Sequence, residues 1–324
     1  MNVATLLKRW SSETETPPLT TLYGFSRMSA PELEVFRESW PGIPVERRRR
    51  MVRGMVEITE ASFEVDYREV FRYLLTDTDA EVRAEAVEGL WEDESPACLR
   101  SLFNLLRQDP SPLVRSKAAS SLGRFALLAE LGQLDGEIGA EVRQALRQVI
   151  DDEGEEIEVC RRAVESIAYF GDEEVWRIIQ AAYHHESKAM RVSAVFAMGR
   201  SIDPSWAPTL LAELKSRDPE MRYEAARSCG ELELQEAIPQ LTQLVHDPDR
   251  EVQGAALAAL GQIGGPEARR LLVSFADSED EALAEAAQEA LDDMEFATGI
   301  VEMPLTEDGS EDGGDDDDDE DDWP

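Results

Sequence analysis

Cysteine is scarce in this chain of 324 residues, and long apolar runs are missing. The three cysteines, Cys98, Cys160 and Cys229, are widely spaced and form no CxxC pair, so neither a disulfide framework nor a zinc site is indicated. Lys8 and Arg9 interrupt the start, MNVATLLKRW, before an apolar stretch of signal-peptide length can build, and no run of about 18 apolar residues occurs anywhere. We therefore expect a soluble cytoplasmic protein.

Basic residues are also few. The chain has 32 Lys and Arg against 69 Asp and Glu, which gives a formal net charge of −37 and an isoelectric point of about 4.3. Thirteen of the acids lie between Glu302 and Asp322, and residues 1–301 still carry a charge of −24. A protein needs Lys and Arg to displace counterions from a phosphate backbone, and a field of this sign also repels anionic lipids. We expect no nucleic-acid partner and no membrane association.

Aromatic residues make up only 7% of the chain and glycine only 20 positions, whereas hydrophobic residues make up 42%. This composition excludes a collagen-like chain and a wholly disordered one. No segment shows the sustained alternation of apolar and polar residues that marks a strand between hairpin turns. The sequence therefore predicts a folded protein without β-sheets.

Internal repetition is the strongest pattern in the sequence. Seven segments align on one apolar anchor residue, here called position 0, and alanine occupies position +4 in each of them. The last five anchors are 31 residues apart, the first interval is 32, and the second is 45 because of an insertion at 127–139. The anchors are Val82, Val114, Val159, Met190, Met221, Val252 and Leu283. Such a period indicates stacked structural units.

Each unit is predicted to be a helical hairpin. Positions 0, +4 and +8 fall on one stripe of a helix, and the alanine allows a second helix to approach closely. Asp109, Asp218 and Asp247 each precede a proline just before an anchor helix, where Asp can accept free N–H groups and Pro suits the first turn. Glycine at +9 in four units matches a helix end. The partner helices are expected at 98–108, 141–150, 174–185, 207–216, 237–245 and 267–276.

The segments outside the repeats are less regular. Residues 1–28, which include Pro17-Pro18 and many Ser and Thr, predict an extended N-terminal arm. Residues 29–62 predict a degenerate pair of capping helices, which a repeat stack needs at its end. The repeats are expected over 63–297, and the like-charged residues 298–324 are expected to form a disordered acidic tail that modulates solubility or access.

The Asp-Pro start, the arginine after the anchor, the alanine at +4 and the Leu-Gly ending resemble HEAT repeats of the bacterial phycobilisome-lyase-like type, over about 44–295. The resemblance implies an all-α, right-handed α-solenoid of about seven to eight helical hairpins, in which the second helix of each hairpin lines the concave surface. It implies less about activity, because similar repeats occur in chromophore lyases, deoxyhypusine hydroxylases, DNA glycosylases and scaffolds.

A binding surface is predicted on the side of the second helix opposite its core stripe, at positions +2, +5, +6 and +9. These positions carry fewer charges than an ordinary solvated face. The candidate protein-binding residues are Trp91, Arg161, Val195, Phe196, Tyr223, Arg227 and Leu257. Aromatic residues and Arg often dominate interface energy, and an apolar groove can accept a helix or an extended peptide. We expect a non-enzymatic scaffold or adaptor; the alternative is that the +5 residues pack between repeats and the aromatics fill gaps.

Enzymatic functions are weaker alternatives. The iron-binding element of the deoxyhypusine hydroxylases is a repeated His-Glu pair, which occurs here once, at His185-Glu186, so we expect no metal and no cofactor. A chromophore (bilin) lyase-like activity is the main alternative, although no tetrapyrrole-specific motif is present. A DNA-repair function would need a basic concave surface, whereas the arginines at 47–50 and 53 form a single basic run.

The arginine that follows the anchor in four units, at 83, 115, 191 and 222, could form an anion-binding ladder. The family resemblance implies instead that it pairs with acids near the starts of neighbouring helices, for which Asp79, Asp218 and Asp249 are available. The insertion at 127–139 is predicted to be a long connection, and long connections in compact arrays are often functional. It is therefore a second candidate contact.

Overall fold

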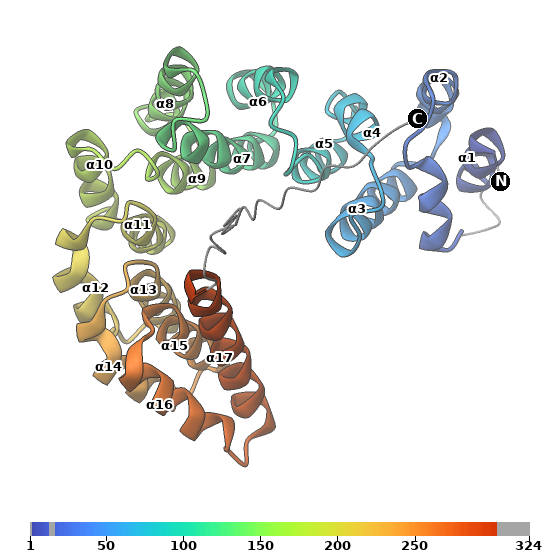
Figure 1. The fold of residues 1–324 in the computed structure, drawn as a ribbon. Helices are drawn as coiled ribbons and strands as arrows, with labels where there is room; N and C mark the ends of the chain where they lie inside the picture. The colour runs from blue at the N-terminus through green and yellow to red at the C-terminus, as the bar shows by residue number, and fades with distance from the viewer. Residues whose placement is uncertain (1, 13–16, 303–324) are drawn as a thin grey trace, which may run out of the picture.

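The computed structural model describes residues 2–12 and 17–302, and these residues form a curved stack of helices without a strand (Figure 1). Within these residues eight hairpins follow one another, and the first helix of each lies in an outer, convex layer while the second lies in an inner, concave layer. The outer helices are α2 (Ala30–Ser39), α4 (Arg68–Leu74), α6 (Pro96–Gln108), α8 (Gly136–Ile150), α10 (Glu173–Tyr183), α12 (Ala207–Glu213), α14 (Ile238–Leu244) and α16 (Gly265–Ala276). The inner helices are α3 (Val45–Ala61), α5 (Ala80–Glu88), α7 (Pro112–Glu130), α9 (Ile157–Ile167), α11 (Lys188–Arg200), α13 (Pro219–Glu231), α15 (Arg250–Ile263) and α17 (Glu281–Glu302). The expected all-α solenoid is confirmed.

The N-terminal segment corrects one expectation, because the described residues of 1–28, namely 2–12 and 17–28, do not form an extended arm. Helix α1 (Val3–Ser11) and the 3-10 helix η1 (Leu19–Phe25) fold against α2 and α3. Trp10 is fully buried, its indole N–H donates to Thr21 Oγ1 at 3.1 Å, and its carbonyl accepts from Arg47. Apolar residues at 3, 6, 7 and 10 have helical spacing, so the segment covers the first hairpin with a small aromatic-rich core.

The inner helices pack closely against one another along the whole stack. The alanine at +4 is fully buried in all seven units, as the sequence predicts. The glycines at +9 lie within their helices instead of ending them, which corrects that expectation. A Cβ on Gly199 would lie 2.9 Å from the Cα of Ser228, and one on Gly230 would lie 2.9 Å from the Cα of Ala259. These glycines therefore permit close contact between successive inner helices.

Arginines join successive hairpins along the edge where the turns within the hairpins lie. Arg83 of α5 binds the Asp109 carboxylate in the next turn with two donors at 2.7 Å, and both side chains are buried. Arg115 binds Glu155 in the same way, and Arg222 binds Asp247. The pairing that the resemblance implied is thus present in these three units. The partners differ from Asp79, Asp218 and Asp249, because each arginine reaches the turn of the following hairpin.

Two of these acids also organise the turn in which they lie. Asp109 accepts the N–H of Ser111, and Asp247 accepts the N–H of Asp249. The N-cap of the following inner helix is therefore two residues later than expected at both places, whereas Asp218 caps α13 as predicted. At Asp109 and at Asp247, one carboxylate thus both stabilises the turn before an inner helix and forms an ion pair with the preceding hairpin.

The insertion also differs from expectation. Residues 127–139 do not form a long connection, because α7 continues to Glu130 and α8 begins at Gly136. Only residues 131–135 connect the two helices. Helix α17 likewise continues past 297 to Glu302, so the acidic segment does not begin at 298 as expected. The remainder of that segment, 303–324, lies outside the described residues. No helix in the described part of the chain is both long and apolar enough to cross a bilayer.

Candidate partner-binding site on the concave face

Three aromatic rings and two arginines meet on the concave side of α9, α11 and α13. We call Tyr169, Phe196, Arg200, Tyr223 and Arg227 the concave cluster. The Arg200 guanidinium lies 5.0 Å from the Phe196 ring centre and 5.9 Å from that of Tyr169. Arg227 lies 5.4 Å from Phe196 and 5.8 Å from Tyr223. All five side chains are partly exposed, so the cations hold the rings in place at the surface.

Acidic side chains neutralise the two arginines of the concave cluster. Glu231 lies 3.4 Å from Arg200 and 3.7 Å from Arg227, and Glu224 lies 3.4 Å from Arg227. Burial raises the pKa of Glu224 to about 7, against the attraction of Arg227. Burial also raises the pKa of Glu231, with Arg200 and Arg227 opposing the shift. The cluster is a compact network of rings and compensated charges.

A groove adjoins the concave cluster between α13 and α15. It has a volume of about 560 Å³, and Tyr223, Arg227 and Glu231 form one side of it. The other side is the surface of α15, where Gly254 and Ala258 leave the helix nearly bare. A Cβ added to Gly254 would meet no atom within 4 Å. The backbone of α15 is therefore accessible to a partner that approaches along the groove.

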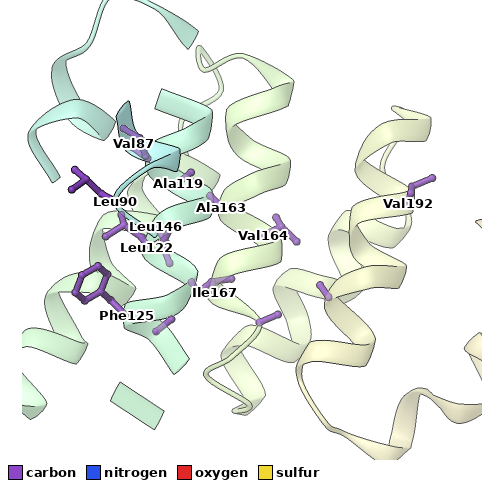
Figure 2. Close-up of a cluster of buried hydrophobic side chains, with 14 of the residues drawn as sticks. Val87, Leu90, Ala119, Leu122, Phe125, Leu146, Ala163, Val164, Ile167 and Val192 are labelled. Carbon is purple, nitrogen blue, oxygen red and sulfur yellow. The ribbon is translucent and has the colours of Figure 1, made fainter. Parts of the chain in front are cut away.

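Two of the predicted site residues are not at this surface. Val195 and Leu257 are fully buried, so their assignment to the binding face is wrong. Both occupy position +5, and the residues at +5 are buried in the other units as well, except for Gln288 in the last one. Figure 2 shows Val87, Ala119 and Val164, from three successive units, in the buried cluster between helices. Each inner helix from α5 to α15 contacts another inner helix on either side, which covers +5 as well as the core stripe. The alternative that +5 residues pack between repeats is confirmed for these positions.

Trp91 is exposed, but it lies apart from the concave cluster. It follows the end of α5, and 45% of its surface is exposed. It lines a small cavity of about 240 Å³ with Phe63 and Tyr67, near the connection between α3 and α4. Helices α7 and α9 separate this position from Phe196 and Tyr223 (Figure 1). Trp91 therefore does not share one surface patch with Phe196 and Tyr223, although all three were predicted to belong to the binding surface.

Arg161 lies next to the concave cluster and is bound within a network of its own. Its guanidinium lies 3.3 Å from Glu165 and donates to Ser193 Oγ at 3.2 Å. Ser193 in turn donates to Glu165. The structure thus brings Phe196, Tyr223 and Arg227 together, with Arg161 beside them.

The sequence reasoning missed Tyr169, Arg200, Glu224 and Glu231. Tyr169, Arg200 and Glu231 occupy position +10 of their units, one helical turn beyond the +6 position that was considered. Extending the exposed face by one turn would have included them. Glu224 at +3 carries a charge, and a charge at such a position ordinarily indicates a solvated side chain.

The arginine run and the His-Glu pair, which were considered for DNA and metal binding, make structural contacts. Arg48 pairs with Asp77 at 2.6 Å and Arg49 with Asp79 at 2.7 Å, so the basic run largely joins α3 to the next hairpin. His185 Nδ1 accepts the N–H of Ser187 in the turn before α11. Within the described ranges, no group of three or more His, Cys, Asp or Glu side chains could hold a metal ion.

Repeated hairpins, alanine-centred inner helices and a concave inner layer define an α-solenoid. The family of HEAT repeats matches residues 68–157 and 207–292, which is more than half of the chain. The chain belongs to the HEAT-repeat family. A search of curated proteins found no match.

Solved structures share this fold at low sequence identity. The complex of CpcE and CpcF of phycocyanin lyase from Nostoc sp. PCC7120 is 14% identical, with 81% of this chain and 95% of that chain covered and a TM-score of 0.55. Kap95p bound to RanGDP is 15% identical, with 90% of this chain and 46% of that chain covered and a TM-score of 0.50. Human deoxyhypusine hydroxylase is 21% identical, with 91% and 96% covered, but its TM-score is only 0.35.

Proposed function

We propose that this protein is a non-enzymatic scaffold or adaptor that binds a protein partner through its concave face, at the concave cluster and the adjoining groove. The observation that carries the proposal is the position of exposed rings, held by Arg200 and Arg227, beside the bare surface of α15. Aromatic and Arg side chains with fixed geometry lose little entropy on binding and often provide most of the interface energy. The proposal includes the expected cytoplasmic setting, where three free cysteines are ordinary.

The shape of the groove favours a helix or an extended segment of the partner. Gly254 and Ala258 allow a partner backbone to approach α15 closely, while Tyr223 and Arg227 contact its side chains from the other wall. Two proteins of similar fold were solved in complex with another protein, CpcE with CpcF and Kap95p with RanGDP. These complexes support a protein partner in general terms.

The test compares partners captured from a native lysate by the intact chain and by surface variants. Ala258 is exposed in the groove, so Ala258→Trp fills the groove without entering the core. Phe196→Ala with Tyr223→Ala removes two rings of the concave cluster. Ala140→Trp places the same bulk on an exposed position of α8 and serves as the control. Quantitative mass spectrometry of the captured proteins is the measurement.

We expect at least one partner to be captured by the intact chain and by Ala140→Trp, and to fall about tenfold or more with both concave variants. Thermal unfolding of each variant separates binding from folding. A double variant that loses stability but keeps its partners would mean that the rings only fill gaps. Capture by Ala258→Trp equal to that of the control would contradict the concave site. A second capture with residues 302–324 deleted would show whether the acidic segment modulates access.

A further inference from the structure

A second cavity, of about 650 Å³, lies between α8 and α10 on the turn side of the stack. We call it the turn-edge pocket. It is lined by the C-terminal end of α8, the turn at 151–156, the start of α9, and parts of α10 and α11. It shares no lining residue with the groove beside the concave cluster. It is therefore a separate feature of the surface.

The pocket lies beside α9, the first inner helix after α5 and α7 that has no arginine at position +1 to bridge to the next hairpin. Arg83 and Arg115 occupy position +1 of their inner helices and reach the next turn. In α9 the same position holds Cys160, whose short side chain donates to the Val149 carbonyl and lines the pocket. The turn at 151–156 is meanwhile held toward the preceding hairpin, because Glu155 pairs with Arg115. No arginine at position +1 reaches across this space, although Arg147 of α8 pairs with Asp151 in the turn and with Glu174 of α10.

The floor of the pocket is apolar. Ile150, Ile157, Val164, Ile178 and Met190 line it, and Ile157 is 38% exposed at the rim although it is a large aliphatic residue. Ala181, also exposed, lies at the α10 wall. A space of this size can hold one or two large apolar side chains of a partner.

The rim of the pocket is acidic. Five acids and two arginines are among its lining residues. Arg147 is already paired with Asp151 and Glu174, and Arg177 with Glu173. Asp152 and Glu153 are exposed in the turn and form no ion pair with any residue that the structure describes. The charge around the opening therefore favours cations and repels phosphates, carboxylates and anionic lipids.

We propose that the turn-edge pocket is a docking site for a basic amphipathic helix of a partner protein. Apolar side chains one turn apart on that helix enter the pocket, and flanking Lys or Arg side chains contact Asp152 and Glu153. The combination of an apolar floor and an acidic rim defines this chemistry, since neither an acidic helix nor a purely charged peptide matches both parts. The site is independent of the proposed concave-face function.

The experiment uses three fluorescent synthetic helices as probes against the full chain. The first is an amphipathic helix of Leu and Lys, the second replaces Leu with Ser at the same charge, and the third replaces Lys with Glu. We expect only the Leu-Lys helix to bind, and to bind more weakly when salt is raised from about 50 to about 500 mM. Binding is measured by fluorescence anisotropy.

Variants locate the bound helix. Ala181→Trp fills the mouth of the pocket, and we expect it to weaken binding about tenfold or more, whereas Ala140→Trp leaves it unchanged. Asp152→Lys with Glu153→Lys should weaken binding and reduce its salt dependence. The control with equal charge is Glu130→Lys with Glu137→Lys, at exposed positions outside the pocket. Thermal unfolding confirms that each variant is folded.

A spectroscopic signal reports on the position directly, because His185 lines the pocket and the chain has three histidines. The His185 ring resonances should shift when the Leu-Lys helix binds, while those of His246 should not. The proposal is wrong if the Leu-Lys helix does not bind, if Ala181→Trp binds it as well as the control does, or if the Leu-Glu helix binds equally. Binding to the acidic surface elsewhere would give the second of these results.

Discussion

The two halves of the stack, the helices up to α7 and the helices from α8 onward, are held together in different ways. From α3 to α9, each hairpin is tied to the next by an arginine and a turn acid, through Arg48, Arg83 and Arg115. From α9 onward these bridges are interrupted: Cys160 replaces the arginine in α9, and Arg191 in α11 donates to main-chain carbonyls of its own turn. Ser216 stands where an acid would receive Arg191. Arg222 and Asp247 restore the bridge from position +1. Two further, more exposed pairs, Lys188 with Asp218 and Arg250 with Asp280, also join later hairpins, from the starts of their inner helices.

Charge is distributed unevenly between the same two halves. Residues 1–130 carry 17 basic and 21 acidic residues, whereas residues 131–301 carry 15 basic and 35 acidic ones. In the first half, Arg48, Arg83 and Arg115 form bridges between hairpins. Other arginines of this half, such as Arg107 and Arg124, contact rings of their own helices. In the second half, arginines of the concave cluster contact rings at the surface. The turn-edge pocket lies where the bridge from position +1 is interrupted, whereas the groove between α13 and α15 lies where Arg222 and Asp247 restore it.

The largest expected effect comes from breaking a buried bridge. Asp109→Ala leaves Arg83 buried without its carboxylate, and we expect a loss of about 3–5 kcal/mol in the free energy of unfolding. Arg191→Ala, at the position equivalent to Arg83 in a hairpin without a bridge from +1, should cost no more than about 1 kcal/mol. Urea unfolding followed by circular dichroism measures both. Equal losses would show that the bridges do not distinguish the two halves.

The next largest effect concerns how the free energy of unfolding depends on pH, through a carboxylate in the second half. Because the pKa of Glu224 in the folded chain is about 7, above the ordinary value of 4.5, the folded state favours the protonated form. The stability from this group is fully present below about pH 4.5 and is lost as the pH rises through about 7. Glu224→Gln should therefore stabilise the chain by about 1–3 kcal/mol at pH 8 and have little effect at pH 5.

Urea midpoints at the two pH values measure this difference. Glu60→Gln, at an exposed position of the inner helix α3 in the first half, is the matched control. If Glu224→Gln instead destabilised the chain at pH 8, the ion pair with Arg227 would outweigh the burial of the carboxylate.

A smaller effect on stability is expected when a glycine is replaced by alanine, and its sign depends on whether the glycine packs against another helix or faces open space. Gly230→Ala places a Cβ against the backbone of α15, and we expect a net loss of about 1–2 kcal/mol after the gain in helix propensity is subtracted. Gly254→Ala meets no atom and should stabilise by about 0.5–1 kcal/mol. Differential scanning calorimetry measures both shifts in melting temperature. Destabilisation by Gly254→Ala would mean that the groove is closed in solution.

Much of the fold could be predicted because the pattern is local and repeated. The anchor, the buried alanine at +4 and the outer helices all follow from helical periodicity within a single unit. The N-terminal helix also had a local signal, the spacing of Leu6, Leu7 and Trp10, which the nearby prolines and hydroxyl residues obscured. The candidate site was predicted in part: Phe196, Tyr223 and Arg227 meet on the concave face, whereas Val195 and Leu257 are buried.

The sequence alone determined the repeating hairpin, the core stripe of each inner helix and the strongly acidic character of the chain. These properties depend on residue spacing and composition, which no neighbour can change. The tertiary structure decided which of the other helix positions remain accessible, because successive inner helices cover +5 and leave +6 and +10 at the surface. It also decided that arginines bridge to the following hairpin and where that bridging stops, since both depend on how adjacent units are placed in space.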